Sequence, residues 1–151
     1  MPPRRPVRVA IVVLLVCALC TVVALARPAQ SRGATSAEKR LLHAVNDVRA
    51  NHGLRRLRLG ASLQSGAHYW ARYLLRHDSF RHGRLVLADA ENIGWLTCRD
   101  GWARTLVRMW LNSYTHRIHL LDPSFRRIGV GVARGSWSGW GCVRIGVNRF
   151  R

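Results

Sequence analysis

A serine and a histidine, Ser113 and His116, lie three residues apart in a segment whose apolar spacing predicts a helix. Side chains three residues apart share one face of a helix, so this hydroxyl and this imidazole could act as nucleophile and general base. Hydrolysis by such a pair also needs an acid that orients the histidine and backbone donors that stabilise an oxyanion. Neither is recognisable in the sequence, so the pair alone is a weak indication of a hydrolase.

The N-terminus carries a hydrophobic run that extends from Val7 to Ala26 and follows Arg4 and Arg5. A positive segment before an apolar one is typical of an export signal. The run ends in Ala24-Leu25-Ala26, which signal peptidase accepts, but it is also long enough to span a membrane as a helix. Cleavage is the favoured alternative. The predicted segments are a signal peptide or N-terminal membrane anchor (1–26), a linker (27–35) and one folded domain (36–151).

Two of the 4 cysteines, Cys17 and Cys20, lie inside the hydrophobic run, where they would be removed with a signal or buried in lipid. Cys98 and Cys142 belong to the folded domain. Two cysteines in an exported domain most simply form one disulfide in an oxidising compartment. We therefore expect a Cys98–Cys142 disulfide in a protein that is secreted or anchored to the outer face of the cytoplasmic membrane.

The chain is strongly basic, with 25 Lys+Arg against 7 Asp+Glu and a formal net charge of +18. Such a charge favours polyanions, and an anionic cell-wall polymer or anionic lipid is a possible partner. Lys39 is the only lysine, and the arginines are scattered without a dense tract. We therefore favour a solvated basic face over a dedicated anion site, and we do not expect nucleic acid as a partner. The arginines assigned to polar positions are Arg40, Arg49, Arg55, Arg56, Arg58, Arg72, Arg76, Arg104 and Arg108.

Three amphipathic helices are predicted in the first two thirds of the domain. The first begins with a capping box, Thr35-Ser-Ala-Glu38, and ends at Gly53. The second is expected to be capped by Ser62 and to end near Asp78, with Leu63, Ala67, Trp70, Ala71 and Leu74 on its apolar face. The third is expected to begin at Asp100 and to stop before Pro123, with Trp102, Leu106, Met109, Trp110 and Ser113 on one side.

Beyond Pro123 the apolar residues alternate, which predicts an antiparallel hairpin that turns between Gly135 and Gly139. Helices followed by strands indicate an α+β fold with a small antiparallel sheet. The glycines from Gly129 to Gly135 do not match a dinucleotide-binding loop, because the spacing is wrong and no helix follows.

Several short motifs occur in a characteristic order along residues 36–150. They are Asn46-x-x-Arg49-x-x-x-Gly53-Leu54, His82 after Phe80, Ala90-Glu91-Asn92, Trp110-Leu-Asn-Ser113-Tyr-Thr-His116-Arg117 and Ile128-Gly-Val-Gly131. This set resembles the CAP superfamily of SCP-like, cysteine-rich secretory proteins, and in particular its bacterial branch. The resemblance implies an α-β-α sandwich with a central groove.

The resemblance also implies a cavity lined by His82, Glu91 and His116. Two imidazoles and a carboxylate could hold zinc or another divalent metal, with Glu91 as a third ligand or as a group that orients a histidine. A buried hydrogen-bond network that binds no metal is an equally weighted alternative. The sequence departs from the family pattern at Ala90, at Thr115 and at His119, where asparagine is typical, and it lacks a second cavity glutamate.

Two functions follow from these observations. The first is a non-catalytic module of the cell envelope or extracellular space whose groove binds a lipid-like or wall-polymer ligand. The alternative is a metal-dependent hydrolase that uses His82, Glu91 and His116. Trp137 and Trp140 are expected to pack in the hairpin, or to contact a membrane or wall polymer if both rings are exposed. Solvated positions without a role are expected for His43, His52, His68 and His77.

Overall fold

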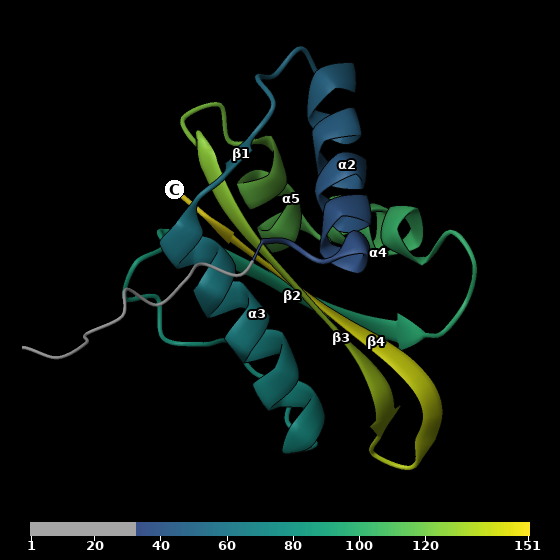
Figure 1. Ribbon diagram of the computed structural model, residues 1–151. Coiled ribbons are helices and arrows are strands. Elements are labelled where there is room, and N and C mark those ends of the chain that lie inside the picture. Colours follow the sequence, from purple (N-terminus) through teal and green to yellow (C-terminus); the bar gives the residue numbers. More distant parts are fainter. Residues whose placement is uncertain (1–32) are drawn as a thin grey trace, which may run out of the picture. The chain divides into compact units, whose positions relative to one another are not determined.

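The computed structural model describes residues 33–151, which all belong to one unit of the chain (Figure 1). The predicted signal or anchor, most of the linker, Cys17 and Cys20 lie outside the described residues. Among residues 33–151, no helix combines the length and apolar character needed to cross a membrane. The helices are α2 (Ser36–Asn51), α3 (Ala61–Arg76), α4 (Trp102–Asn112) and α5 (Tyr114–Leu121), and the strands are β1 (Arg58–Leu59), β2 (Ala90–Thr97), β3 (Arg127–Trp137) and β4 (Trp140–Phe150).

The sheet has the strand order β1-β3-β4-β2. Strands β3 and β4 form the predicted antiparallel hairpin, which turns at Ser138 and Gly139, both with positive φ. The long strand β2 adds to the other side of β4 in antiparallel register. The two-residue strand β1 pairs with β3 in parallel, so one edge of the sheet is mixed. The sequence had predicted a sheet with antiparallel strands only.

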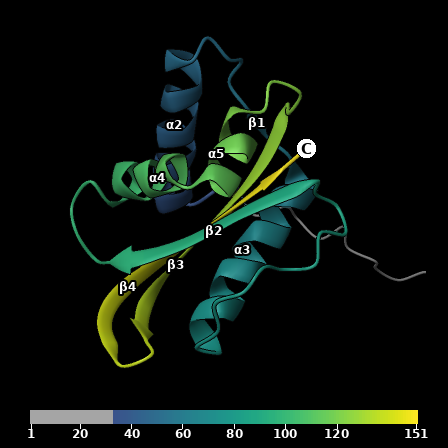
Figure 2. The ribbon, with the colours of Figure 1, turned by 180° about the vertical axis from the view of Figure 1, so that it is seen from behind.

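Helices cover both faces of the sheet, as Figures 1 and 2 show. Helix α3 packs on one face, where Ala67, Ala71 and Leu74 meet Ile145 and Val147. Helices α2, α4 and α5 cover the other face, and their apolar side chains pack around β2 and the ends of the hairpin. This arrangement is the predicted α-β-α sandwich.

Two glycines of β3 allow α3 to lie directly on the sheet. A Cβ atom added at Gly129 would come within 2.0 Å of the Leu63 backbone, and one added at Gly131 within 2.0 Å of Ala67 O. A substitution at either position would therefore force the helix away from the sheet. This contact gives the Ile128-Gly-Val-Gly131 motif its structural role.

Helix α2 begins as predicted, because Thr35 and Glu38 form a complete capping box. The predicted caps of the other two helices are wrong. Helix α3 begins after Gly60, whose N–H is held by Ile128 O in the pairing of β1 with β3, so Ser62 lies inside the helix. Helix α4 begins after Gly101, whose left-handed conformation turns the chain one residue beyond Asp100.

The predicted third helix is interrupted at Ser113, which has extended backbone angles and separates α4 from α5. Met109 was expected on the apolar side of this helix but is 46% exposed. Pro123 does mark the downstream limit, since α5 ends at Leu121.

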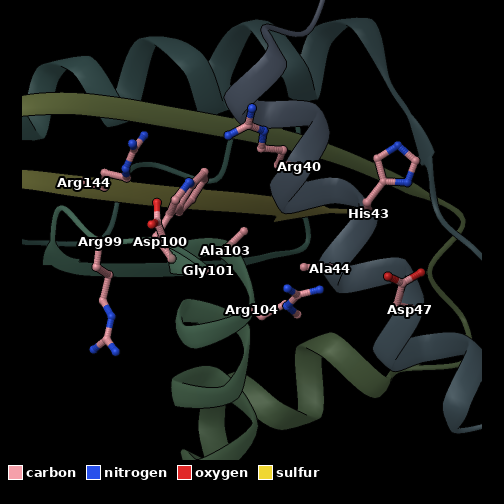
Figure 3. A pocket seen from close by; sticks show the side chains of 11 residues that line it. Arg40, His43, Ala44, Asp47, Arg99, Asp100, Gly101, Ala103, Arg104 and Arg144 are labelled. Atoms are coloured by element: carbon pink, nitrogen blue, oxygen red, sulfur yellow. The ribbon is translucent and has the colours of Figure 1, made fainter.

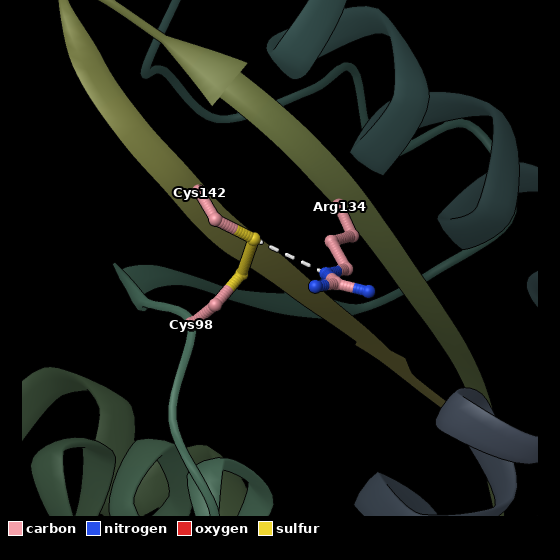
Figure 4. Close-up of a disulfide and its surroundings, with 3 residues drawn as sticks. All are labelled: Cys98, Arg134 and Cys142. Carbon is pink, nitrogen blue, oxygen red and sulfur yellow. Dashed lines mark hydrogen bonds between the residues drawn. A yellow bond between two sulfur atoms is a disulfide. The ribbon is translucent and has the colours of Figure 1, made fainter.

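The predicted Cys98–Cys142 disulfide is present, with a Cα–Cα distance of 5.3 Å (Figure 4). It joins the chain just after β2 to the beginning of β4, where Cys98 N also donates to Cys142 O over 2.8 Å. Arg134 on β3 also contacts the disulfide, since its Nε lies 3.1 Å from Cys142 Sγ. The disulfide thus fixes one end of the sheet.

Arg49 was assigned to the solvated face, and this prediction is wrong because its side chain is fully buried. Its guanidinium donates to the carbonyl oxygens of Arg55, Leu120 and Asp122, over 3.0, 2.8 and 3.0 Å. These three acceptors compensate in part for the loss of water around the charge, while Nη2 is buried without a partner. Arg49 therefore ties the end of α2 to the end of α5.

Candidate functional site

Glu91 lies near the beginning of β2 and is buried, but both of its carboxylate oxygens have partners. Oε1 accepts the backbone N–H of Gly83 over 2.8 Å and lies 3.1 Å from His82 Nδ1. Oε2 accepts from Arg149 Nε over 2.9 Å. A carboxylate only accepts, so His82 donates from Nδ1 and keeps Nε2 as the nitrogen that could bind a ligand. Glu91 therefore orients the His82 ring.

His116 lies in the first turn of α5, close to His82, and the two ring centres are 6.4 Å apart. Its Nδ1 is 2.8 Å from Ser113 Oγ, which confirms that Ser113 and His116 are in contact. Burial lowers the pKa of His116 below its ordinary value, and the nearby His82 and His119 lower it further. His116 is therefore neutral at pH 7. Within residues 33–151, no carboxylate forms a hydrogen bond with His116, so the structure contains no orienting acid for a Ser113–His116 pair.

Asn92, next to Glu91 on β2, connects the site to α5. Its amide donates to His116 O over 2.9 Å, and its Oδ1 lies 2.9 Å from Nδ1 of His119. Burial lowers the pKa of His119, as does the nearby His82, whereas Asp122 raises it. His119 therefore joins His82 and His116 as a third imidazole of the site.

Sequence reasoning did not assign Asn92, His119 or Arg149 to the site. Asn92 was recognisable as part of the Ala90-Glu91-Asn92 motif, and His119 was noted only as a departure from the family pattern. Arg149 carried no local signal, because it meets Glu91 only through the pairing of β2 with β4.

The predicted metal ligands include two imidazoles, His82 and His116, whose rings lie close together, whereas Nδ1 of His119 is engaged by Asn92. Among residues 33–151, no group of three His, Cys, Asp or Glu side chains is placed to hold a metal ion. Glu91 is engaged by three donors, so its position fits a group that orients His82 better than a third ligand. A zinc ion bound tetrahedrally by both rings at about 2.1 Å would draw their centres to roughly 5 Å, so the rings would have to approach each other.

A groove of about 550 Å³ opens beside His116. Its lining is formed mainly by apolar side chains of β2 and α4, and the polar side chains in the lining are those of Ser113 and His116. The exposure of Met109 is explained by this groove, since its side chain forms part of the wall. The apolar lining residues are Phe80, Ile93, Trp95, Leu96, Leu106, Met109 and Trp110.

An aromatic cluster continues from the groove to the hairpin turn. The ring centres of Trp95 and Trp137 are 5.0 Å apart, those of Trp95 and Trp140 are 5.6 Å apart, and Phe80 lies 6.0 Å from Trp137. Trp137 is buried, whereas Trp140 is 54% exposed. The condition that both hairpin tryptophans be exposed is therefore not met, and Trp137 packs in the core.

The four histidines expected to be solvated divide into two groups. His43, His52 and His77 are exposed. His68 is half-buried, and its Nδ1 lies 2.8 Å from Oε1 of the buried Glu38. The expectation of a solvated position is therefore wrong for His68, which instead connects α3 to the capping box of α2.

The family of the protein is shown by its sequence, and the fold agrees with it. Residues 42–143 match the CAP family, the cysteine-rich secretory protein family. This match spans more than half of the chain, so the protein belongs to the CAP family. Compared by sequence with curated proteins, it has no significant match.

Solved structures with the same fold come from bacteria and animals. An outer surface protein from Borrelia burgdorferi is 17% identical, with a TM-score of 0.55 over 79% of this chain and 96% of that chain. The venom allergen-like protein 4 of Schistosoma mansoni is 10% identical, with a TM-score of 0.54 over 77% and 89%. An extracellular SCP-domain protein from Bacillus anthracis is 19% identical, with a TM-score of 0.50 over 73% of this chain and 39% of that longer one. At these identities the likeness shows the fold alone.

Proposed function

We propose that this CAP domain is an exported, non-catalytic module that binds a lipid-like ligand in the groove beside His116. The observation that carries the proposal is the apolar lining of that groove, formed by side chains such as Trp95, Met109 and Trp110. Its volume of about 550 Å³ lies within the roughly 300–1,000 Å³ of typical small-molecule sites. An apolar tail would cover these side chains, and a polar head would meet Ser113 and His116 at the margin.

The composition of the groove favours a lipid-like ligand over a wall polymer. A polysaccharide presents hydroxyl groups that need hydrogen-bond partners, whereas most of the lining offers none. The neutral state of His116 suits a site whose walls are apolar, because a charged imidazole there would lose hydration.

Titration with dodecanoate, followed by tryptophan fluorescence, tests the proposal. Met109→Gln places a polar group in the groove wall and is expected to weaken binding roughly tenfold, because an amide is then buried against the alkyl chain. Ile118→Gln is a matched control, since Ile118 is 45% exposed against 46% for Met109 and does not line the groove. Equal affinities for the two variants would exclude the groove as the binding site.

A metal-dependent hydrolase remains the alternative, and the proximity of His82 and His116 favours it. The hydrogen bond from His82 to Glu91 is also the kind of contact that orients a metal-binding histidine. Metal analysis of protein purified without chelator tests this function. Bound metal at one equivalent that disappears in His116→Ala supports it, and absence of metal in the unmodified protein excludes it.

We infer an envelope or extracellular location from the hydrophobic segment of residues 7–26 and from the Cys98–Cys142 disulfide. An outer surface protein and an extracellular protein among the similar structures are consistent with it. The intact mass of the exported protein distinguishes a chain released by signal cleavage from a chain that keeps its N-terminal segment as an anchor. A chain that starts near Arg27 is released by cleavage, and one that starts at Met1 or Pro2 is anchored.

A further inference from the structure

Four of the scattered arginines of the sequence line one pocket of the fold. A pocket of about 460 Å³ lies between α2 and the beginning of α4 and is lined by Arg40, Arg99, Arg104 and Arg144. These residues come from a helix, a loop, a second helix and a strand. Figure 3 shows Arg40 projecting from α2 and Arg104 from α4, whereas Arg99 extends outward at the edge.

The positive charges of this pocket outnumber the negative ones. Among the described residues, none of the four arginines forms an ion pair within 4.0 Å. Two carboxylates also line the pocket, Asp47 and Asp100. Asp47 is engaged by Arg56, which lies outside the lining, at 3.4 Å. Four guanidinium groups therefore stand against one free carboxylate.

Arg144 packs against a side chain that also lines the pocket. Its guanidinium stacks on Trp102, 4.9 Å from the ring centre, and its Nε is buried without a hydrogen-bond acceptor. Burial lowers the pKa of Arg144, and the nearby Arg134 and Arg40 lower it further. Arg49 Nη2, Trp137 Nε1 and the Asn148 amide lack a partner in the same way, so the case for a ligand rests on the group of arginines and not on this one atom.

The backbone beside the pocket has the same polarity. Helix α4 begins after Gly101, and its first turn has neither a side-chain cap nor an acidic residue. The N–H groups of the first turn and the positive end of the helix dipole therefore add to the charge of the arginines.

We propose that this pocket is a binding site for a phosphate group, carried either by a soluble molecule or by a lipid headgroup. Guanidinium groups bind phosphate through paired, charge-assisted hydrogen bonds, and the pocket offers several from different elements. The pocket and the apolar groove have no lining residue in common, so the phosphate site would be a second binding site beside the groove. Arg40 and Arg104 are exposed, as expected for a solvated basic face, and the proposal assigns a ligand to that face.

The Cys98–Cys142 disulfide stabilises this pocket. Arg99 follows Cys98 directly, and Arg144 lies two residues after Cys142. The bond therefore holds together the two segments that carry these arginines.

Titration with inorganic pyrophosphate at constant ionic strength, followed by backbone amide NMR, tests the proposal on the chain purified from the exported fraction of expressing cells. Arg40→Gln/Arg104→Gln removes two exposed cations from the pocket and is expected to weaken binding at least about tenfold. Arg72→Gln/Arg76→Gln removes the same charge from exposed positions of α3 outside the pocket and is expected to change the affinity by less than about twofold.

Saturable shifts at the pocket residues, lost in the first double variant and kept in the second, support the site. Shifts spread over the surface, equal effects of both double variants, or no response to pyrophosphate overturn it. A second arm identifies the source of the phosphate, with vesicles of phosphatidylglycerol compared with phosphatidylcholine. Selective loss of phosphatidylglycerol binding in the pocket variant assigns a lipid headgroup, and unchanged vesicle binding with lost pyrophosphate binding assigns a soluble phosphate.

Discussion

Glu91 and Arg149 face each other across neighbouring strands and form a buried ion pair, with Nε 2.9 Å from Oε2. The Glu91 side chain is 1% exposed and that of Arg149 is 14% exposed. The other carboxylate oxygen orients His82, so one residue links the structure of the sheet to the geometry of the site.

Glu91→Gln is expected to lower the free energy of unfolding by about 3 kcal/mol, because the charge of Arg149 would be left in a largely buried position without its counterion. Urea denaturation measures this loss. Asp89→Asn is the matched control, since the Asp89–Arg151 pair spans 3.7 Å with both side chains 56% exposed, and its removal is expected to cost less than about 0.5 kcal/mol. A similar loss in both variants would contradict the role given to Glu91.

Stability is expected to fall as the pH is lowered below about 6.5. His116 and His119 have lowered pKa values in the folded protein, so between the ordinary histidine pKa of about 6.5 and the folded values the unfolded chain binds more protons. Above about pH 6.5 both imidazoles are mostly neutral in the folded and in the unfolded chain. As the pH falls below about 6.5, the unfolded chain is protonated first, and this proton binding favours unfolding. The free energy of unfolding measured at pH 7.5 and 5.5 tests the prediction.

The same two measurements on His116→Asn/His119→Asn are expected to show a smaller loss of stability on acidification. His43→Asn, at an exposed position of α2, is expected to behave like the unmodified protein. An unchanged pH dependence in the double variant would show that other groups cause the effect.

Removal of the disulfide is expected to destabilise the domain by about 2–4 kcal/mol, because the bond closes a loop with a sequence separation of 44. Thermal unfolding of Cys98→Ser/Cys142→Ser against the unmodified protein measures the loss. Addition of a reductant provides the control, since it is expected to lower the melting temperature of the unmodified protein and to leave that of the variant unchanged. A reductant effect of equal size in both proteins would argue against this interpretation.

Arg49→Met is expected to lower the free energy of unfolding by about 3 kcal/mol, since three carbonyl oxygens lose a charged donor. Arg56→Met removes an exposed ion pair with Asp47 and is expected to cost less than about 1 kcal/mol. Chemical denaturation compares the two. Equal, small losses would show that water replaces the Arg49 guanidinium at the ends of α2 and α5.

The hairpin and the first helix could be predicted because their signals are local. Apolar residues of β3 and β4 alternate with glycine or polar residues, and Thr35 and Glu38 form a capping box within one turn. Strand β2 gives no such signal, since both of its faces are buried and two of its buried residues, Glu91 and Asn92, are polar. Strand β1 is too short for any period to show.

The site was only partly predictable for a related reason. The resemblance to the CAP family predicted a cavity with His82, Glu91 and His116, and the structure places these side chains near one another. Arg149 required the register of β2 against β4, and the basic pocket required the packing of α2 against α4. Burial of Arg49 depends on acceptors at Leu120 and Asp122, more than seventy positions away in the sequence.

The proposal of a lipid-like ligand rests on the groove, and Met109 offers a direct probe of it. The chain has 2 methionines, Met1 and Met109, so ¹³C-methyl methionine labelling gives one signal from the groove wall and at most one other. Addition of dodecanoate is expected to shift the Met109 methyl signal saturably at one equivalent per chain, while any Met1 signal stays in place. A Met109 signal that does not move while dodecanoate binds would contradict the assignment of the groove as the ligand site.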